Sequence, residues 1–206
     1  MHQTRAEVTR KLPIERKGTK YVARARIDVK NSVPVVVAVR DMLKLARTAK
    51  EVNEMRKEKL LKINGKEVKD LRDSIRLFNI FEADKHYVLA LTKNGKFVFE
   101  ETKEKSRLCK VINKKILKGG KVQINLNDGS NILSKEKINI DDSAYLDFEG
   151  KIKNHVKFDK GKECVVISGK YVGLKGRVES VEGKKAKIRL GHNKIAELEK
   201  GSVIVI

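Results

Sequence analysis

Residues 169–178 of this sequence read GKYVGLKGRV, with glycines at positions 169, 173 and 176. Glycine permits tight turns and lets the backbone approach another strand closely, so this stretch predicts turns between short strands. Residues 185–190 read KAKIRL, in which basic and apolar residues alternate. Because successive side chains of a strand point to opposite faces, one face of this strand is cationic and the other is buried. Together the two stretches predict a small C-terminal β-barrel over residues 154–206.

Earlier in the chain, three two-residue turn signals predict β-hairpins. They are Asn64-Gly65, Asn94-Gly95 and Asp128-Gly129, each between stretches that bear apolar residues. Such dipeptides accept the positive φ angles that tight hairpin turns require. Residues 122–127, before the last turn, alternate apolar and amide side chains, which predicts a strand with one buried face. Between the second and third hairpins we predict a short helix over residues 100–108.

Two helices are expected before the first hairpin. Pro34 suits a first helical turn, and the apolar residues after it recur at intervals of three and four, at Val36, Val39, Leu43 and Ala46. This spacing predicts a helix over residues 34–46. Thr48 and Glu51 form a capping-box pattern, which predicts a second helix that starts at Thr48 and directs Val52 and Met55 inward. The order over residues 33–90 is therefore helix, helix and hairpin.

The composition favours a polyanionic partner. The chain has 206 residues, with 48 Lys and Arg against 27 Asp and Glu, and a formal net charge of +21. Residues 1–32, 33–90, 91–153 and 154–206 carry +6, +4, +5 and +6. Such an even excess suits contact with phosphates on several sides and argues against a membrane-surface protein, whose charge is usually concentrated. With no long apolar run and no signal peptide visible, we expect an intracellular protein.

Residues that usually carry catalysis or bind metals are scattered. The four histidines, at positions 2, 86, 155 and 192, form no HExxH pair, and Cys109 and Cys164 form no Cys-x-x-Cys motif. Two cysteines exclude a disulfide framework and a four-thiolate zinc site, and both lie beside apolar residues, as small buried side chains do. We therefore predict no enzymatic activity, no metal and no cofactor.

Two segments resemble known RNA-binding modules. Residues 33–68 resemble the module named after bacterial ribosomal protein S-four, with a glutamate at position 58 where that module commonly has glycine. The matching residues are Arg40-Asp41-Met42-Leu43, Ala46 and Leu61-Lys62-Ile63-Asn64-Gly65-Lys66. Residues 158–191 resemble the KOW motif of ribosomal and transcription-elongation proteins through Gly161, Val165-Val166-Ile167 and residues 169–178.

From about Leu12 onward, the chain resembles the ribosomal protein S-four-e (S4e) family of archaea and eukaryotes. The matching stretches are residues 16–21, 108–114 and 118–133. The resemblance implies a structural component of the small ribosomal subunit, in the cytoplasm, that binds small-subunit ribosomal RNA and neighbouring ribosomal proteins. We expect an α+β protein, a monomer outside the ribosome, with a basic N-terminal arm (1–32), an RNA-binding module (33–90), a central mostly β domain (91–153) and the KOW barrel (154–206).

The RNA contacts are expected from side chains in three of these segments. Because aromatic residues are 5% of the chain and Trp is absent, phosphate, sugar and shape contacts should dominate over base stacking. The candidates are Arg16, Lys17 and Lys20 in the arm; Arg40, Lys44, Arg47, Lys50, Lys62, Asn64 and Lys66 in the first module; and Lys170, Lys175, Arg177, Lys185, Lys187 and Arg189 in the barrel.

Two other functions use the same modules. An RNA-modifying enzyme such as a pseudouridine synthase can carry the first module, but it needs a sizeable catalytic domain with a positioned carboxylate, and residues 91–206 offer no such candidate. A transcription-elongation factor can carry a KOW barrel, but it would be expected to show an apolar docking surface for polymerase.

Overall fold

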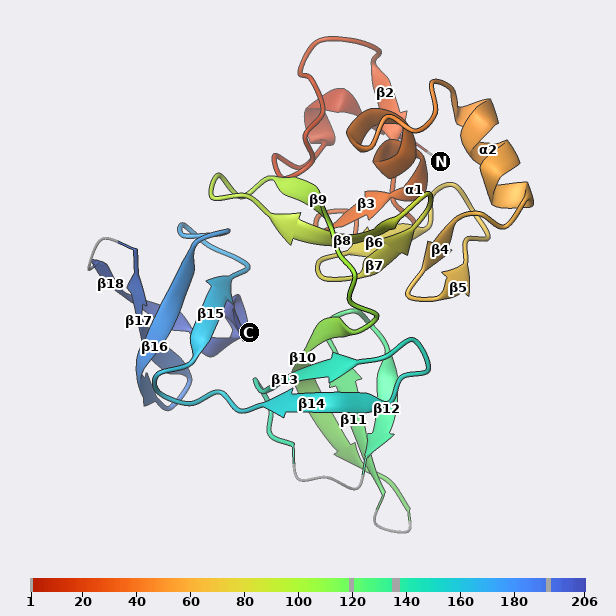
Figure 1. The fold of residues 1–206 in the computed structure, drawn as a ribbon. Helices are drawn as coiled ribbons and strands as arrows, with labels where there is room; N and C mark the ends of the chain where they lie inside the picture. The colour runs from red at the N-terminus through yellow and green to blue at the C-terminus, as the bar shows by residue number, and fades with distance from the viewer. Residues whose placement is uncertain (1, 119–120, 135–137, 192–193) are drawn as a thin grey trace. The chain divides into compact units, whose positions relative to one another are not determined.

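The computed structural model describes residues 2–118, 121–134, 138–191 and 194–206. It consists of two compact units, the first made of residues 1–92 and 96–105 and the second of residues 93–95 and 106–206 (Figure 1). The buried apolar residues form three separate cores, one in the first unit and two in the second.

The N-terminal segment, predicted as an arm, is packed onto the first unit. Strand β1 (His2–Thr4) pairs antiparallel with β2 (Tyr21–Ala23), and a 3-10 turn, η1 (Arg5–Glu7), follows β1. Leu12 is only 5% exposed and belongs to the core of the first unit. Burying this side chain ties the segment to the body of the unit through the hydrophobic effect.

The first helical segment is shorter than predicted. It follows β3 (Ser32–Pro34) and consists of α1 (Val35–Val37) and a π-helical stretch, η2 (Ala38–Met42). Leu43 N donates to Ala38 O at 2.9 Å, five residues back. The prediction of a helix as far as residue 46 is wrong, because Lys44 has a φ of +58° and this left-handed conformation ends the helix. The predicted apolar stripe is nevertheless buried at Val36, Val39 and Ala46.

The second helix and the first hairpin are as predicted. Helix α2 (Ala49–Lys57) begins after Thr48, whose Oγ1 accepts a hydrogen bond from Glu51 N at 3.3 Å. This bond satisfies an N–H that the first helical turn leaves without a partner. Strands β4 (Lys62–Ile63) and β5 (Lys66–Glu67) then form a hairpin, and its turn residues Asn64 and Gly65 have positive φ angles.

The remaining strands of the first unit complete a sheet with the order β5-β4-β7-β8-β9, while β6 (Ser74–Arg76) pairs with β3. Strands β7 (Ile80–Glu82), β8 (His86–Leu91) and β9 (Phe97–Glu101) follow one another, and the hairpin predicted at Asn94-Gly95 joins the last two. The helix predicted over residues 100–108 is wrong, because Glu100 and Glu101 pair with β8. Phe97 and Phe99 pack on the first core.

The second unit begins with a five-stranded antiparallel sheet of order β12-β11-β10-β13-β14, called the central sheet below. Its strands are β10 (Arg107–Ile116), β11 (Val122–Leu126), β12 (Asn131–Ser134), β13 (Ser143–Leu146) and β14 (Ile152–Val156). The hairpin predicted at Asp128-Gly129 joins β11 to β12. Gly119 and Gly120, part of the stretch that carries the family resemblance, lie outside the described residues.

The other five strands form the C-terminal sheet, of order β18-β17-β16-β15-β19. They are β15 (Glu163–Val166), β16 (Lys175–Glu182), β17 (Lys185–Leu190), β18 (Lys194–Glu199) and β19 (Val203–Val205), with a 3-10 turn, η3 (Lys200–Ser202), before the last. The alternation predicted for β17 is confirmed, since Ala186, Ile188 and Leu190 are buried. The antiparallel order agrees with small-barrel architecture, while closure into a barrel stays a prediction.

Two glycines of the C-terminal sheet show why the motif needs them. Gly173 has a φ of +84°, a conformation that L side chains rarely adopt. Gly176 lies where β16 approaches β17, and a Cβ there would come within 2.6 Å of Arg189 O. The first glycine permits a turn and the second a close approach of two strands, as expected from the sequence.

Candidate RNA-binding surfaces

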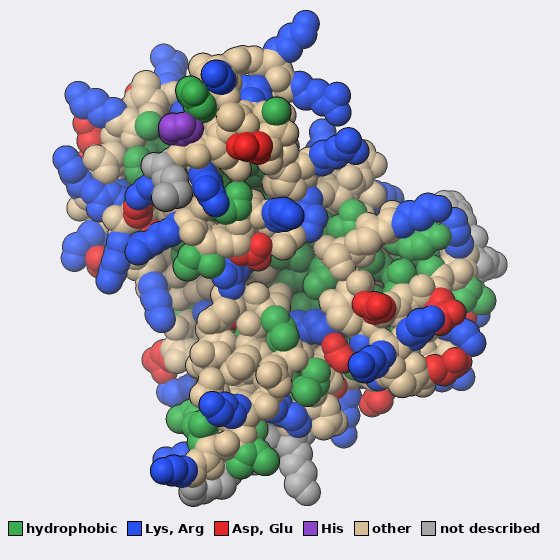
Figure 2. Space-filling view, turned by 180° about the vertical axis from the view of Figure 1, so that it is seen from behind, with side chains coloured by type: hydrophobic (Ala, Val, Ile, Leu, Met, Phe, Trp, Pro, Cys, Tyr) green, Lys and Arg blue, Asp and Glu red, His purple; other side chains and the backbone are tan. Residues whose placement is uncertain are grey.

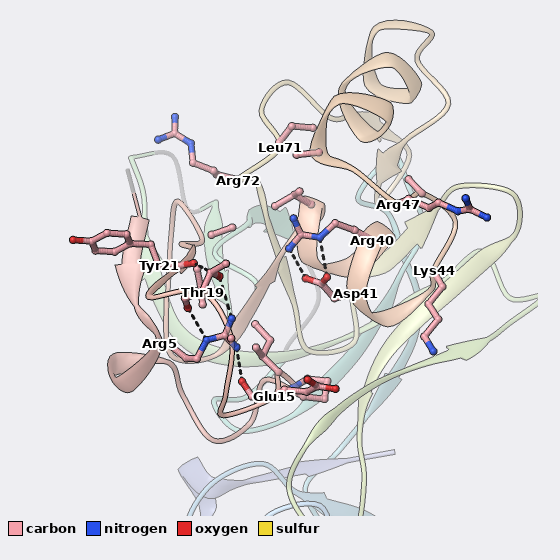
Figure 3. Close-up of a pocket in the computed structure, with 18 of the residues that line it drawn as sticks. Arg5, Glu15, Thr19, Tyr21, Arg40, Asp41, Lys44, Arg47, Leu71 and Arg72 are labelled. Atoms are coloured by element: carbon pink, nitrogen blue, oxygen red, sulfur yellow. Dashed lines mark hydrogen bonds and ion pairs between the residues drawn. The ribbon is translucent and has the colours of Figure 1, made fainter.

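The first unit contains a hollow of about 1180 Å³, lined by residues from three separate stretches of the chain (Figure 3). The stretches are residues 5–23, 36–49 and 70–72. Six of the lining side chains are basic and three are acidic. We call it the basic hollow, and its charged lining residues are Arg5, Glu15, Lys17, Arg40, Asp41, Lys44, Arg47, Asp70 and Arg72. Its volume exceeds the 300–1,000 Å³ common for small-molecule sites, which suits a segment of a polymer.

Arg5 holds one wall of the basic hollow in place. Its Nε donates to Thr19 O at 2.7 Å and its Nη2 to Thr19 Oγ1 at 3.2 Å, while Nη1 donates to Glu15 O (Figure 3). The guanidinium therefore joins the beginning of the N-terminal segment to its return stretch. Because these bonds occupy Arg5, its role in the hollow is structural. Arg5 is not among the residues predicted from the sequence, because no local pattern marks it.

Two further arginines of the hollow are neutralised by neighbouring carboxylates. Arg40 makes two hydrogen bonds to Asp41, at 2.8 and 2.9 Å, and the side-chain bond raises the pKa of Arg40. Arg72 Nη2 donates to Asp70 Oδ2 at 2.7 Å. Hydrogen bonds from the side chain and the backbone N–H of Arg72 lower the pKa of Asp70 to about 2. Each pair joins one arginine to one carboxylate, so the two pairs add little net charge to the hollow.

Besides Arg5, whose donors are taken by neutral oxygens, the cations of the basic hollow outside the two arginine–aspartate pairs are Lys17, Lys44 and Arg47. Within the ranges that the structure describes, none of their side chains has a carboxylate at ion-pair distance. Figure 3 shows Lys44 and Arg47 directed away from the Arg40–Asp41 pair. The left-handed backbone at Lys44 turns the chain between the two helical segments and places these two residues at the hollow. The sequence predicts all three residues as RNA contacts. It does not predict that they line one hollow.

The predicted cations of the C-terminal sheet have acidic neighbours instead. Four side chains form ion pairs: Lys185 with Glu197 at 2.9 Å, Lys187 with Glu182 at 3.0 Å, Arg189 with Glu179 at 2.5 Å and Arg177 with Glu163 at 3.6 Å. These pairs join neighbouring strands of the sheet or the two ends of one hairpin. The cationic strand face expected from KAKIRL is therefore largely balanced by glutamates.

Two lysines near Tyr171 form no ion pair with a carboxylate among the residues that the structure describes. Lys170 Nζ lies 6.0 Å and Lys194 Nζ 5.2 Å from the centre of the Tyr171 ring. An aromatic face attracts cations through its quadrupole, so each ammonium group is attracted to the ring. Lys175 is exposed at the start of β16. Lys194 is not among the residues predicted from the sequence, because it lies outside the residues that match the KOW motif.

The other predicted residues of the first unit are not among those that line the basic hollow. Arg16, Lys20 and Lys50 are exposed, as is Lys66, while Lys62 is half-buried on β4. Lys20 Nζ lies 5.4 Å from the centre of the Tyr21 ring. Asn64 differs from the rest: it is buried, and its Oδ1 accepts a hydrogen bond from Ile80 N at 2.9 Å. This bond joins the hairpin turn to β7, which gives Asn64 a structural role.

Metal-binding groupings do not appear in the parts of the chain that the structure describes. No cluster of three or more His, Cys, Asp or Glu side chains there could hold a metal ion. Cys109 and Cys164 are both buried, as predicted. Burial raises the pKa of Cys109 to about 12 and that of Cys164 to about 11, so both are neutral thiols near pH 7. His192 lies outside the described residues.

Basic side chains cover much of the molecule beyond these sites. Figure 2 shows Lys and Arg spread over the visible face, with fewer Asp and Glu side chains between them. The described helices include none that is both long and apolar enough to cross a membrane.

Known proteins resemble this chain along most of its length. The model of ribosomal family S4e matches residues 83–152, and that of the KOW motif matches residues 160–190. The small ribosomal subunit protein eS4 of Methanospirillum hungatei is 34% identical over 177 residues, which cover 80% of this chain and 73% of that protein. The chain belongs to the ribosomal family S4e. The family predicted from the sequence is thereby confirmed, and with it a structural ribosomal component rather than an enzyme.

Two further S4e proteins extend the comparison. The eS4 protein of Methanocella arvoryzae is 31% identical over 189 residues, which cover 88% of this chain and 81% of that protein. The crystal structure of ribosomal protein S4e from Thermoplasma acidophilum superposes with a TM-score of 0.72 at 22% identity, covering 85% of this chain and 95% of that one. The mostly β architecture is thus the fold of the S4e family.

Proposed function

We propose that this S4e protein is held in the small ribosomal subunit by distributed contacts to ribosomal RNA, and that the basic hollow is its main phosphate-binding surface. The observation that carries this proposal is the gathering of Lys17, Lys44 and Arg47 around one concavity. Among the described residues their side chains form no ion pair, and Glu51 accepts a hydrogen bond from the backbone N–H of Arg47 at 2.8 Å. Cations in a concave surface reinforce one another's potential, because the low-dielectric walls focus the field. An RNA backbone that enters the hollow releases counterions for each phosphate that these side chains neutralise.

The helix–helix–hairpin order gives the hollow a rigid support. Helix α2 is capped at Thr48, and the hairpin turn is fixed by Asn64. On this support, the exposed Lys50 and Lys66 and the half-buried Lys62 extend the phosphate contacts from the hollow to the neighbouring surface. Arg16 and Lys20 do the same on the N-terminal segment. These residues and the module that they form stay a proposal.

The C-terminal sheet has a smaller part in this proposal. Lys170, Lys175 and Lys194 contact phosphates, while Arg177, Lys185, Lys187 and Arg189 mainly stabilise the sheet through their glutamate partners. Ion pairs at an exposed surface are partly screened, so a phosphate can compete with a glutamate for the same cation, with a lower net gain.

The proposal also covers the oligomeric state, the location and the protein partners of the chain. We expect the protein to be a monomer in the cytoplasm before assembly, and to contact neighbouring ribosomal proteins afterwards. We expect no membrane association, since the charge of +21 is spread over all segments of the chain.

Sedimentation of small subunits tests the proposal. We compare the full chain with a variant that carries Lys17→Gln, Lys44→Gln and Arg47→Gln, in sucrose gradients at low and moderate salt. The variant should leave the small-subunit peak at a lower salt concentration, because it lacks three phosphate contacts. The control carries Lys57→Gln, Lys103→Gln and Lys105→Gln, three exposed lysines away from the hollow with the same change in net charge.

Equal salt resistance of the two variants would contradict the role of the basic hollow. Migration of the unmodified chain as free protein, or its recovery with RNA polymerase after RNase treatment, would contradict the ribosomal function altogether.

A further inference from the structure

One face of the central sheet carries amide side chains that none of the contacts above use. It is formed by the neighbouring strands β10, β11 and β12, on the side away from the core. We call it the amide face, and it consists of Asn113, Lys115, Gln123, Asn125, Asn131 and Leu133. We propose that the amide face binds the minor groove of an RNA duplex. The proposal rests on the proposed function only in that the partner is RNA, since it concerns a different surface.

The pairing of the strands sets the six side chains in two parallel rows. Asn113 lies opposite Asn125, which lies opposite Asn131. In the next row on the same face, Lys115 lies opposite Gln123, which lies opposite Leu133. Directly paired residues of antiparallel strands share a face, so each row runs across the sheet with a spacing of about 5 Å. Ile124, between Gln123 and Asn125 in sequence, is fully buried on the other face.

The amide groups are placed to bond with a partner. Gln123 Nε2 donates to Asn125 Oδ1 at 3.0 Å, and this bond orients both side chains. Among the described residues, no partner is found for the Asn125 NH2 group, the Gln123 oxygen or the side chain of Asn131. Asn113 and Asn131 are exposed, and Asn125 is half-buried. An amide offers two donors and one acceptor oxygen, so the rows present both kinds of group.

An RNA duplex fits this chemistry better than a phosphate backbone alone. The minor groove of A-form RNA is wide and shallow and displays 2′-hydroxyls and base edges, which both donate and accept hydrogen bonds. The amide face has one lysine and no carboxylate, so it does not repel the flanking phosphates. It has no aromatic side chain on which an unpaired base could stack, and this favours paired RNA. Leu133, 63% exposed, offers an apolar contact to a ribose.

Hydroxyl-radical footprinting of a small-subunit ribosomal RNA transcript with the full chain tests the proposal. Hydroxyl radicals attack riboses that are accessible to solvent, so a protein in the minor groove protects the sugars of a paired segment. The test variant carries Asn113→Ala, Asn125→Ala and Asn131→Ala. The matched control is Asn154→Ala on β14, an exposed asparagine whose Oδ1 accepts from the next backbone N–H at 2.9 Å, as Asn113 Oδ1 does at 2.8 Å.

The proposal predicts that the triple variant loses protection of one paired segment, while Asn154→Ala keeps it. The affinity should fall roughly tenfold, as expected for three modest hydrogen bonds, with an unchanged dependence on salt because no charge is removed. Identical footprints for the triple variant and the unmodified chain would overturn the proposal, and so would a loss confined to unpaired nucleotides.

A second variant keeps the test decisive if the triple variant does not fold. Asn125→Asp retains the shape of the side chain but replaces its two donors by an acceptor, and Asn154→Asp makes the same charge change elsewhere in the domain. Asn125→Asp alone should lose the protected segment. Failure of the proposed function has a different signature, since the unmodified chain would then protect no RNA at all, which would also overturn this inference.

Discussion

The basic hollow and the C-terminal sheet both carry cations that stand out in the sequence, yet these cations have different neighbours. In the hollow, Lys17, Lys44 and Arg47 have no carboxylate at ion-pair distance within the described residues, and they come from two distant stretches of the chain. In the sheet, Lys185 and Lys187 each lie within 3.0 Å of a glutamate oxygen. A basic residue count is therefore a poor measure of the charge that a surface offers to RNA.

The difference follows from how each surface is built. The strands of the C-terminal sheet bring every second residue to the same face, so glutamates on β16 and β18 lie directly beside the cations of β17. The hollow is lined by three stretches, residues 5–23, 36–49 and 70–72, and most of its lining residues lie outside the strands. Cross-strand pairing thus stabilises the sheet, whereas irregular backbone leaves the cations of the hollow available.

The largest effect on stability is expected at Gly176, where strand β16 approaches strand β17. Gly176→Ala places a Cβ within 2.6 Å of Arg189 O and 2.8 Å of Ile188 Cγ2, so β16 and β17 must separate. We expect the free energy of unfolding of the C-terminal sheet to fall by about 2–4 kcal/mol. Gly201→Ala is the control, because nothing lies within 4 Å of a Cβ there. Similar urea midpoints for the two variants would contradict the prediction. They would mean that the sheet which carries the ion-paired cations does not need the close approach of β16 and β17 at Gly176.

A smaller effect is expected in the wall of the basic hollow. Asp70 accepts hydrogen bonds from the side chain and backbone of Arg72, which lower its pKa from 3.8 to about 2. Because the folded-state pKa is depressed, this stabilisation is present above about pH 4 and is lost as the pH falls toward 2. Asp70→Asn should lower the free energy of unfolding by at most about 2 kcal/mol at pH 7 and make less difference near pH 2.

Urea unfolding at both pH values measures this effect. Glu58→Gln, an exposed carboxylate of the same unit, serves as the control and should change little at either pH. A loss of stability in Asp70→Asn that is equal at pH 7 and pH 2 would mean that the carboxylate charge is not what stabilises the wall.

The smallest effect is expected when one ion pair of the C-terminal sheet is removed. Glu182→Gln removes the partner of Lys187, 3.0 Å away, and should make this lysine available to phosphates. We expect the affinity for small-subunit ribosomal RNA at low salt to rise about twofold more than in Glu104→Gln, which changes the net charge equally at an exposed site. An equal rise in both variants, in filter binding, would mean that only net charge matters and that the ion pair does not mask Lys187.

The parts of the fold that depend on local chemistry could be predicted from the sequence. Asn64-Gly65 and Asp128-Gly129 indicated hairpins because few residues accept the backbone angles of these turns, and Thr48 indicated a helix start because its hydroxyl caps an N–H. The helix predicted over residues 100–108 failed because pairing with β8 and β13 outweighs the helical preference of its Glu and Lys residues.

The candidate site was predicted only as a set of residues. Lys44 and Arg47 were predicted as RNA contacts of the first module. That they line the same hollow as Lys17 depends on the packing of residues 5–23, which no local pattern encodes. Arg5 was missed for the same reason, since its partners Thr19 and Glu15 lie far along the chain. The glutamates of the C-terminal sheet are visible in the sequence. The strand register that places them beside the cations could not be predicted from it.

The dependence of RNA affinity on salt tests the central comparison most directly. We compare Lys17→Gln, Lys44→Gln and Arg47→Gln in one variant with Lys185→Gln, Lys187→Gln and Arg189→Gln in another, each with three fewer positive charges. Each phosphate contact contributes about 0.7–0.9 to the slope of log affinity against log salt. The hollow variant should therefore lose about 2–3 units of slope, and the sheet variant less than about one. Equal losses, or a larger loss in the sheet variant, would contradict the assignment of the basic hollow as the main RNA-binding surface.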